Sequence, residues 1–211
     1  MTIVIGAGAA GLLAAVAAVR RGRQVFVYDK MARPGIKLGL AGGGRCNLSN
    51  SGDLLLGLHN CKFLRPALAS LDNAALRNLL AEIGVATTVD QWGRVYPQAV
   101  TGPEFAAHLH SWLKKQGASF YFGSPLTNIR TKDGKLEAIE INGKAVSCTR
   151  AILACGGKAW PQTGRDGAAL AVLERAGHEI VPVLPALAPL KTKETWPTQM
   201  KGISLKDVVV T

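Results

Sequence analysis

The fold is decided by residues 2–29, which read TIVIGAGAAGLLAAVAAVRRGRQVFVYD. Thr2–Ile5 is a β-branched run that predicts a short buried strand, and Ala9–Arg21 is an alanine- and leucine-rich stretch that predicts a helix. Gln24–Tyr28 predicts a second buried strand. Because strand, helix and strand follow one another within about thirty residues, this stretch predicts a βαβ unit with parallel strands.

The turn between the first strand and the helix carries the pattern GxGxxG at Gly6, Gly8 and Gly11. In dinucleotide-binding domains the first glycine makes the turn, the second lets a diphosphate approach the backbone, and the third lets helix and strand pack closely. No Ser, Thr, Asp or Asn stands at the start of the helix, so its free N–H groups are left for a ligand. Asp29 ends the second strand, where a carboxylate accepts the ribose hydroxyls of an adenosine. These features predict an adenine dinucleotide site.

The segment after Asp29 bears on which dinucleotide is bound. An acidic residue at this position disfavours a 2′-phosphate, and hence NADP. Three consecutive glycines at 42–44 let the main chain pass close to a flat or charged group and form an anion-binding nest. Lys37 and Arg45 are candidates to neutralise the diphosphate. The same βαβ unit serves NAD and FAD, and this glycine-rich segment favours FAD.

The rest of the chain predicts an α/β domain with an inserted β-rich excursion around residues 118–148. The dipeptides Asp133-Gly134 and Asn142-Gly143 are typical of hairpin turns, and Met31–Asn60 reads as a long loop. The remaining predicted elements are helices at Asn73–Ile83, Pro103–Gln116 and about Gly167–Ala176, and strands at Ser119–Phe122, Leu126–Thr131, Leu136–Asn142, Lys144–Cys148 and Ala151–Ala154. We expect a dinucleotide-binding domain over residues 1–185 and the start of a second, β-rich substrate domain over residues 186–211.

Charge and cysteine content narrow the function classes. Lys and Arg number 25 against 14 Asp and Glu, and the formal net charge of +11 suggests an anionic partner such as a nucleotide. No basic run is longer than two residues and aromatic residues make up only 6% of the chain, so we expect no nucleic-acid partner. The four cysteines, at positions 46, 61, 148 and 155, form no CxxC pair and no metal-ligand spacing with histidine, so we expect no metal site.

The uncharged first nineteen residues could be mistaken for a signal peptide or a membrane span. The basic residues Arg20 and Arg21 follow the apolar stretch instead of preceding it. Three glycines within the first eleven residues would also weaken a spanning helix. We therefore expect a cytoplasmic protein that has no membrane partner.

The chain resembles the bacterial NAD(P)/FAD-dependent oxidoreductases of the BaiN type, a flavoprotein family also known as the aminoacetone oxidase family. The motifs that carry the resemblance are GAGAAG at 6–11, GIKLGLAGGGRCNLSN at 35–50, GRVYP at 93–97 and ACGGKAWPQTG at 154–164. The resemblance extends over essentially the whole chain, and GGGRCN is specific among flavoproteins. It implies a Rossmann-like FAD-binding domain.

The resemblance also implies an activity and a binding site. The expected activity is FAD-dependent transfer of a hydride between NAD(P)H and an organic acceptor, with a small molecule as substrate. The residues expected to contact FAD are Gly6, Gly8, Ala9, Ala10, Gly11, Asp29, Lys30, Lys37, Gly43, Gly44, Arg45, Cys46, Asn47, Leu126, Gly156 and Gly157.

No catalytic residue is nominated, because the flavin carries the hydride and the protein positions and tunes it. Cys46 lies in the segment expected near the flavin, where it is either a flavin-contacting thiol or a small buried apolar residue. Spacing predicts no Ser-His-Asp arrangement and no pair of carboxylates.

Members of this family are close to twice the length of this chain, which we expect to correspond to their N-terminal half. Three alternatives to the expected FAD-dependent activity stay open. The chain is a fragment that binds a dinucleotide without turnover, a subunit completed by a second polypeptide that supplies the C-terminal half, or an NAD-only Rossmann oxidoreductase.

Overall fold

The computed structural model describes residues 1–55, 63–164, 166–185, 192–200 and 203. The chain divides into two units, Met1–Val181 and Pro182–Thr211. Of the second unit the structure describes residues 182–185, 192–200 and 203, which include the short helix α7 (Trp196–Gln199). Most of the predicted second domain at 186–211, including its end at Lys206–Thr211, lies outside the described residues, so its β-rich character stays a prediction.

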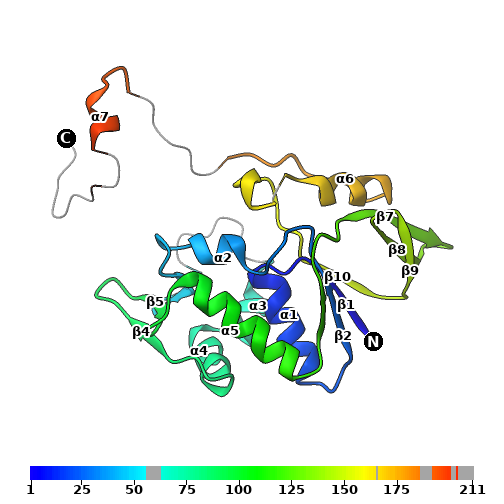
Figure 1. Ribbon diagram of the computed structural model, residues 1–211, viewed down its shortest axis with the longest axis horizontal. Coiled ribbons are helices and arrows are strands. Elements are labelled where there is room, and N and C mark those ends of the chain that lie inside the picture. The colour runs from blue at the N-terminus through cyan, green and yellow to red at the C-terminus, as the bar shows by residue number, and fades with distance from the viewer. Residues whose placement is uncertain (56–62, 165, 186–191, 201–202, 204–211) are drawn as a thin grey trace. The chain divides into compact units, whose positions relative to one another are not determined.

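The larger unit is built on a parallel sheet of four strands in the order β10-β1-β2-β6 (Figure 1). β1 (Thr2–Ile5) lies at its centre, between β2 (Val25–Tyr28) and β10 (Ala151–Leu153). β6 (Ser119–Tyr121) extends the sheet beyond β2. Helix α1 (Ala9–Val19) connects β1 to β2, which confirms the predicted βαβ unit.

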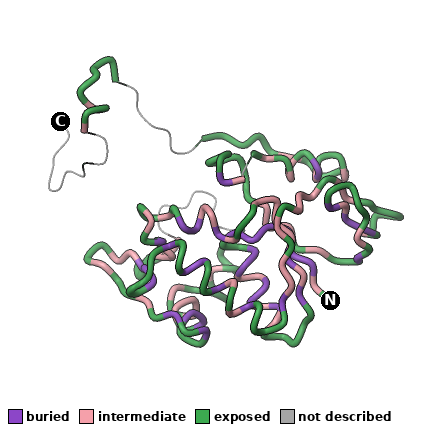
Figure 2. The backbone as a smooth tube through the Cα atoms, viewed as in Figure 1, coloured by how far each residue is buried: buried purple, intermediate pink, exposed green. Residues whose placement is uncertain are grey.

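The two faces of this sheet are buried against different partners. Val4 of β1 belongs to a core cluster shared with α1 and α5 (Gly102–Lys115). Its neighbours Ile3 and Ile5 point to the opposite face, where they pack against a second, antiparallel sheet. Both faces of β1 are therefore covered, as Figure 2 shows by the buried residues along α1, β1 and β2. This explains why the strand is apolar throughout.

The second sheet is the predicted β-rich excursion. It consists of β7 (Leu126–Lys132), β8 (Lys135–Ile141) and β9 (Lys144–Ser147), joined by the two predicted hairpin turns. Asp133 and Asn142 both have positive φ, as such turns require. The excursion begins later than we predicted at residue 118, because Ser119–Tyr121 pairs with β2 and forms the edge of the parallel sheet.

Helix α5 begins where its sequence predicts, because a capping box fixes its first turn. The N–H of Glu104 donates to Thr101 Oγ1, and the N–H of Thr101 donates to Glu104 Oε2 at 2.7 Å. The N–H and the hydroxyl of Thr101, which both donate to this carboxylate, hold the pKa of Glu104 below its usual value. Helix α4 (Asn73–Glu82) has a simple N-cap, in which the carboxylate of Asp72 accepts the N–H of Ala75 at 2.8 Å. Both predicted helices are confirmed.

The prediction of one long loop over 31–60 is wrong in part. Helix α2 (Ile36–Leu40) and strand β3 (Ser49–Asn50) lie within it, and residues 56–60 lie outside the described part of the chain. Gly35 is the N-cap of α2 and has a φ of +64°, which suits glycine, and α2 packs against α5. The N–H of Gly35 donates to the carbonyl of Ala7 at 2.8 Å, which ties this segment to the glycine turn.

A further small sheet and several short helices also belong to the larger unit. β3 and β4 (Thr87–Val89) flank β5 (Arg94–Pro97), and helix α3 (Arg65–Ser70) precedes α4. After β10 the chain forms a short 3₁₀ helix at Pro161–Thr163 and then α6 (Ala168–Arg175), which packs against β7. The predicted helix over about Gly167–Ala176 is confirmed.

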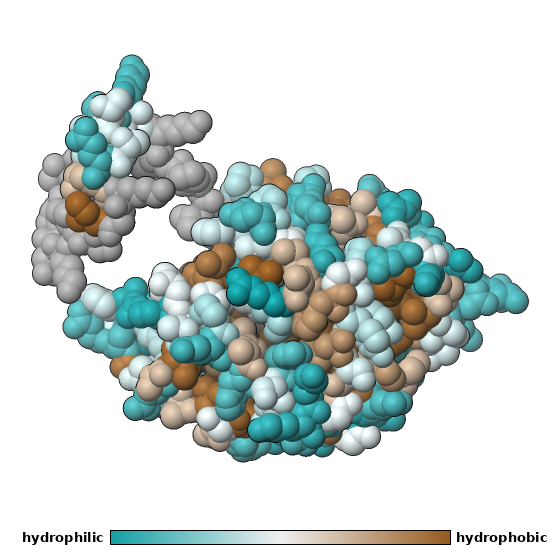
Figure 3. All heavy atoms as spheres, viewed as in Figure 1, coloured by the Kyte–Doolittle hydropathy of each residue, from teal (hydrophilic) through white to brown (hydrophobic). Residues whose placement is uncertain are grey.

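The surface of the larger unit is mixed in character. Figure 3 shows hydrophilic residues interspersed with apolar ones over the visible face. Within the described residues, every helix is too short or too polar to cross a membrane.

Candidate functional site

The glycine turn lies at the carboxyl end of β1 and leads into an open helix end. Gly6 has a φ of +105°, and its N–H donates to the carbonyl of Tyr28 at 2.7 Å. Gly8 precedes the first residue of α1, no side chain caps this end, and the first turn holds no acidic residue. Ala9 and Ala10 are exposed. The N–H groups of this first turn therefore face outward, where an anion can bind them.

Asp29 is held firmly beside this turn. Its Oδ2 accepts the N–H of Ala7 at 2.5 Å, and its Oδ1 accepts the N–H of Met31 at 2.7 Å. The backbone of Asp29 is fixed as well, because its N–H donates to the carbonyl of Tyr121 at 2.9 Å. A carboxylate offers about four acceptor positions, so this half-buried group retains capacity for two further donors, such as a pair of hydroxyls.

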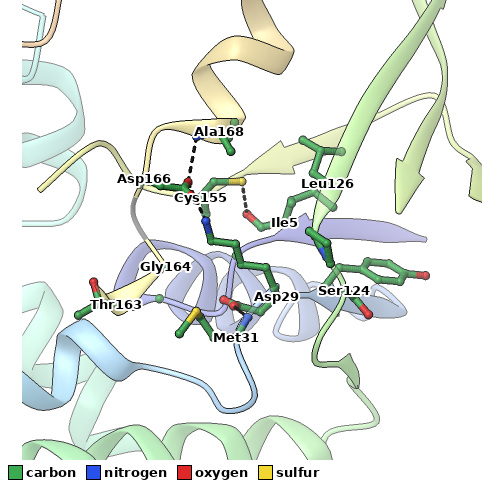
Figure 4. Close-up of a pocket in the computed structure, with 18 of the residues that line it drawn as sticks. Ile5, Asp29, Met31, Ser124, Leu126, Cys155, Thr163, Gly164, Asp166 and Ala168 are labelled. Atoms are coloured by element: carbon green, nitrogen blue, oxygen red, sulfur yellow. Dashed lines mark hydrogen bonds and ion pairs between the residues drawn. The ribbon is translucent and has the colours of Figure 1, made fainter. Parts of the chain in front are cut away.

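A first hollow opens above the carboxyl ends of β1 and β2 (Figure 4). It holds about 610 Å³ of empty space that opens to solvent. Asp29 and Met31 lie at one side, Ser124 and Leu126 at a second side, and the segment leading into α6 at the far side. Ligands of open α/β sheets bind in this crevice beyond the carboxyl ends of the strands.

A second, larger hollow of about 1260 Å³ adjoins the first. The start of α1, helix α2, the end of β10 and helix α6 line it, mostly with apolar side chains such as Leu38, Leu153, Leu170 and Leu173. Residues 154–156 and Ala169 line both hollows. One extended ligand can therefore reach from the first hollow, which Asp29, Lys30 and Asp166 line, into the more apolar second one.

The structure brings ten of the predicted site residues to these hollows. Those lining the first are Gly6, Gly8, Asp29, Lys30, Leu126 and Gly156. Those lining the second are Ala9, Ala10, Lys37, Asn47 and again Gly156.

Other predicted residues have different surroundings. Gly11 is buried where α1 crosses the glycine turn. Arg45 turns toward Tyr96, with its guanidinium carbon 4.4 Å from the ring centre and its Nη2 donating to the tyrosine oxygen at 3.1 Å. Gly43, Gly44 and Gly157 are not among the residues that line the two hollows. Their contact with a cofactor stays a prediction.

Cys46 is fully buried, and this burial raises the pKa of its thiol from 9.0 to about 11. The thiol is therefore protonated at neutral pH, and it is the thiolate that reacts. This environment suits a small buried residue and not a redox thiol.

We expect Cys46 to resist alkylation by iodoacetamide at pH 8 in the folded chain and to react once urea unfolds it, as measured by mass spectrometry of its tryptic peptide. Because the folded-state pKa lies above the unfolded one, the stabilisation from the neutral thiol is complete below pH 9 and is lost as the pH rises toward 11. Equal alkylation rates in the folded and unfolded chain would contradict this burial.

Sequence reasoning missed several residues of the first hollow. Ser124, Thr163, Asp166 and Ala168 all line it, although they lie far from the glycine motif in sequence. Asp166 forms an ion pair with Lys30, Nζ to Oδ1 at 2.7 Å, and this hydrogen bond lowers the pKa of its carboxyl. The N–H of Ala168, two residues on, donates to Asp166 Oδ1, an Asx turn that the local sequence can suggest, but the partner Lys30 is set by the fold. In the described part of the chain, His, Cys, Asp and Glu side chains form no group of three that could hold a metal ion.

Two curated proteins are similar to this chain over most of its length. A 3-dehydro-bile acid delta(4,6)-reductase of Clostridium scindens is 33% identical over 199 residues, which are 90% of this chain and 47% of that protein. A ribosomal RNA dihydrouridine synthase of Haemophilus influenzae is 29% identical over 96% of this chain and 52% of its own length. The chain thus spans about half the length of the curated relatives it matches.

The fold has counterparts among solved structures. The open conformation of a flavocytochrome c3 fumarate reductase matches with a TM-score of 0.57 and 18% identity, over 83% of this chain and 40% of that one. The fold is accordingly that of a Rossmann-type FAD-binding domain. The model of the HI0933-like protein Rossmann domain matches residues 1–210, which confirms the resemblance drawn from the motifs. By this match, the chain belongs to the HI0933-like family.

Proposed function

We propose that this chain is the FAD-binding part of an FAD-dependent oxidoreductase that passes a hydride from NAD(P)H through the flavin to an organic acceptor. The observation that carries the proposal is the uncapped start of α1 beside the fixed carboxylate of Asp29, at the mouth of two adjoining hollows. The predicted cytoplasmic location and small-molecule substrate form part of the proposal.

The adenosine end of FAD fits the first hollow. Asp29 keeps acceptor positions for the two ribose hydroxyls after it has accepted the N–H groups of Ala7 and Met31. Leu126 lies at the edge of the same hollow and supports the predicted adenine contact through its backbone. Gly6 and Gly8 line the same hollow, and the second glycine of such a turn lets the diphosphate approach the backbone.

The flavin end fits the second hollow. Its apolar lining suits a flat ring system, while Lys37 and Asn47 at its rim supply a cation and an amide. Bound FAD would supply the hydride-accepting ring. The chain's own residues would bind the diphosphate, orient the ring and exclude water from one side of it.

The test is the absorbance of the purified, dialysed chain from 300 to 550 nm, before and after incubation with FAD. Flavin bands that survive dialysis, with consumption of NADH or NADPH on addition of an acceptor, are the expected result. A chain that takes up no flavin would contradict the proposal, and one that prefers NADH to FAD would favour the NAD-only alternative. Bound flavin without any turnover would favour the fragment, or the subunit completed by a second polypeptide.

A second candidate acceptor, contrary to the expectation of no nucleic-acid partner, is a base in RNA. The formal net charge of +11 favours it, together with the name of the Haemophilus influenzae relative, a ribosomal RNA dihydrouridine synthase. If RNA is the acceptor, the chain should bind structured RNA with an affinity that falls steeply as salt rises from 50 to 300 mM. Absence of RNA binding at 50 mM salt would leave the small-molecule acceptor.

A further inference from the structure

An ion pair crosses the first hollow. Lys30 follows Asp29 at the end of β2, and Asp166 precedes α6, 136 residues later. Lys30 Nζ lies 2.7 Å from Asp166 Oδ1, and both residues line the hollow. The same Oδ1 accepts the N–H of Ala168 at 3.0 Å, as Figure 4 shows at the start of α6. Asp166 therefore holds the lysine and the helix start together.

This pair sets the charge beside the expected ribose. In dinucleotide-binding domains an acidic residue at the end of the second strand accepts the ribose 2′-hydroxyl, while a nearby basic residue accommodates a 2′-phosphate. Lys30, next to Asp29, is the cation placed for that second role. Its charge is already compensated by Asp166, so the three side chains together carry a net charge of −1.

A second lysine, Lys158, comes close to the segment that carries Asp166. The side-chain carbons of Lys158 pack along Gly167, which also lines the hollow. Lys158 comes from the segment after β10, whereas Lys30 comes from the strand that carries Asp29. An experiment must therefore separate the contribution of Lys30 from that of Lys158.

We propose that Asp166 is a specificity residue, which makes the first hollow accept an adenosine with a free 2′-hydroxyl and reject one with a 2′-phosphate by occupying Lys30. The proposal rests on the proposed dinucleotide function. FAD and NAD carry the free hydroxyl, whereas NADP carries the phosphate. An enzyme that draws hydride from NADPH would in this way keep its electron donor out of the adenosine site of its flavin.

The test compares two ligands that differ only in this phosphate, ADP-ribose and 2′-phospho-ADP-ribose, by calorimetric titration of the full chain. We expect the wild type to prefer ADP-ribose, and Asp166→Asn to reduce that preference by about tenfold, because one negative charge is removed near a phosphate dianion. Asparagine keeps an oxygen to accept the N–H of Ala168, so α6 should begin unchanged.

Two further variants make the result specific. Asp133→Asn removes the same charge from the exposed turn between β7 and β8, where asparagine also adopts positive φ, and it should leave the preference unchanged. Adding Lys30→Gln to Asp166→Asn should restore the preference, because the freed ammonium is gone while Lys158 remains.

The outcomes separate this proposal from the proposed function. An unchanged preference in Asp166→Asn, an equal change in Asp133→Asn, or a reduced preference that persists without Lys30 would each overturn the role of Asp166, while ADP-ribose binding itself would still support the dinucleotide site. A wild-type chain that binds neither ADP-ribose nor FAD would instead overturn the proposed function, and this inference with it.

Discussion

Replacing Gly11 with alanine should lower the free energy of unfolding by about 3 kcal/mol or more. A β-carbon at this position would lie 1.7 Å from the carbonyl oxygen of Gly6 and 2.9 Å from its carbonyl carbon. Both are backbone atoms of the turn that joins β1 to α1, so no side-chain rotation can relieve the overlap. The helix would have to move away from the central strand. Urea unfolding followed by far-ultraviolet circular dichroism measures the effect.

The matched control for this variant is Gly157→Ala. A β-carbon there would meet nothing within 4 Å, and the backbone does not have the positive φ that favours glycine. This substitution should change the free energy of unfolding by less than about 1 kcal/mol. Equal midpoints for Gly11→Ala and wild type would show that the close crossing of helix and turn does not exist in the folded chain.

The part of the fold that sequence could predict is the part governed by local signals. The capping box of Thr101 and Glu104 fixes the start of α5 within four residues of chain, and the turn at Asp133-Gly134 fixes a hairpin in the same way. By contrast, α2 is five residues long with Gly39 inside it, so neither length nor periodicity marks it as a helix. It forms because Gly39 lets it pack closely against Pro103 at the start of α5.

The residues of the candidate site also fall into two groups, those that local sequence predicts and those that only the fold brings together. The glycine turn and Asp29 lie within one βαβ unit, so the positions of these residues in the sequence are enough to predict that they lie close together in the fold. Asp166 and Ser124 reach the same hollow from segments that the parallel sheet brings back to its carboxyl edge, through β10 and β6. No local pattern encodes that return. The contact of Arg45 with Tyr96, 51 residues further along the chain, is likewise set by the fold, and the predicted phosphate contact of Arg45 stays a prediction.

Replacing Gly8 with glutamate should abolish FAD uptake, with a loss of affinity of at least about a hundredfold. Gly8 lies directly before α1 and lines the first hollow, so a glutamate side chain would project a negative charge into the position proposed for the diphosphate. The fold should survive, because Gly8 has an extended backbone (φ −79°, ψ −172°) that any residue adopts. An acidic group at a helix start also interacts favourably with the helix dipole. Absorbance of the dialysed chain after incubation with FAD measures the loss.

The control is Ser147→Glu, which adds the same charge on the exposed side of β9, opposite the uncharged Ala138. It should bind FAD as the wild type does, and circular dichroism should show both variants folded. If Gly8→Glu is folded and still retains FAD, the diphosphate does not lie against the glycine turn. The flavin would then have to be held by the second hollow alone, and the pairing of Asp29 with an adenosine ribose would lose its support.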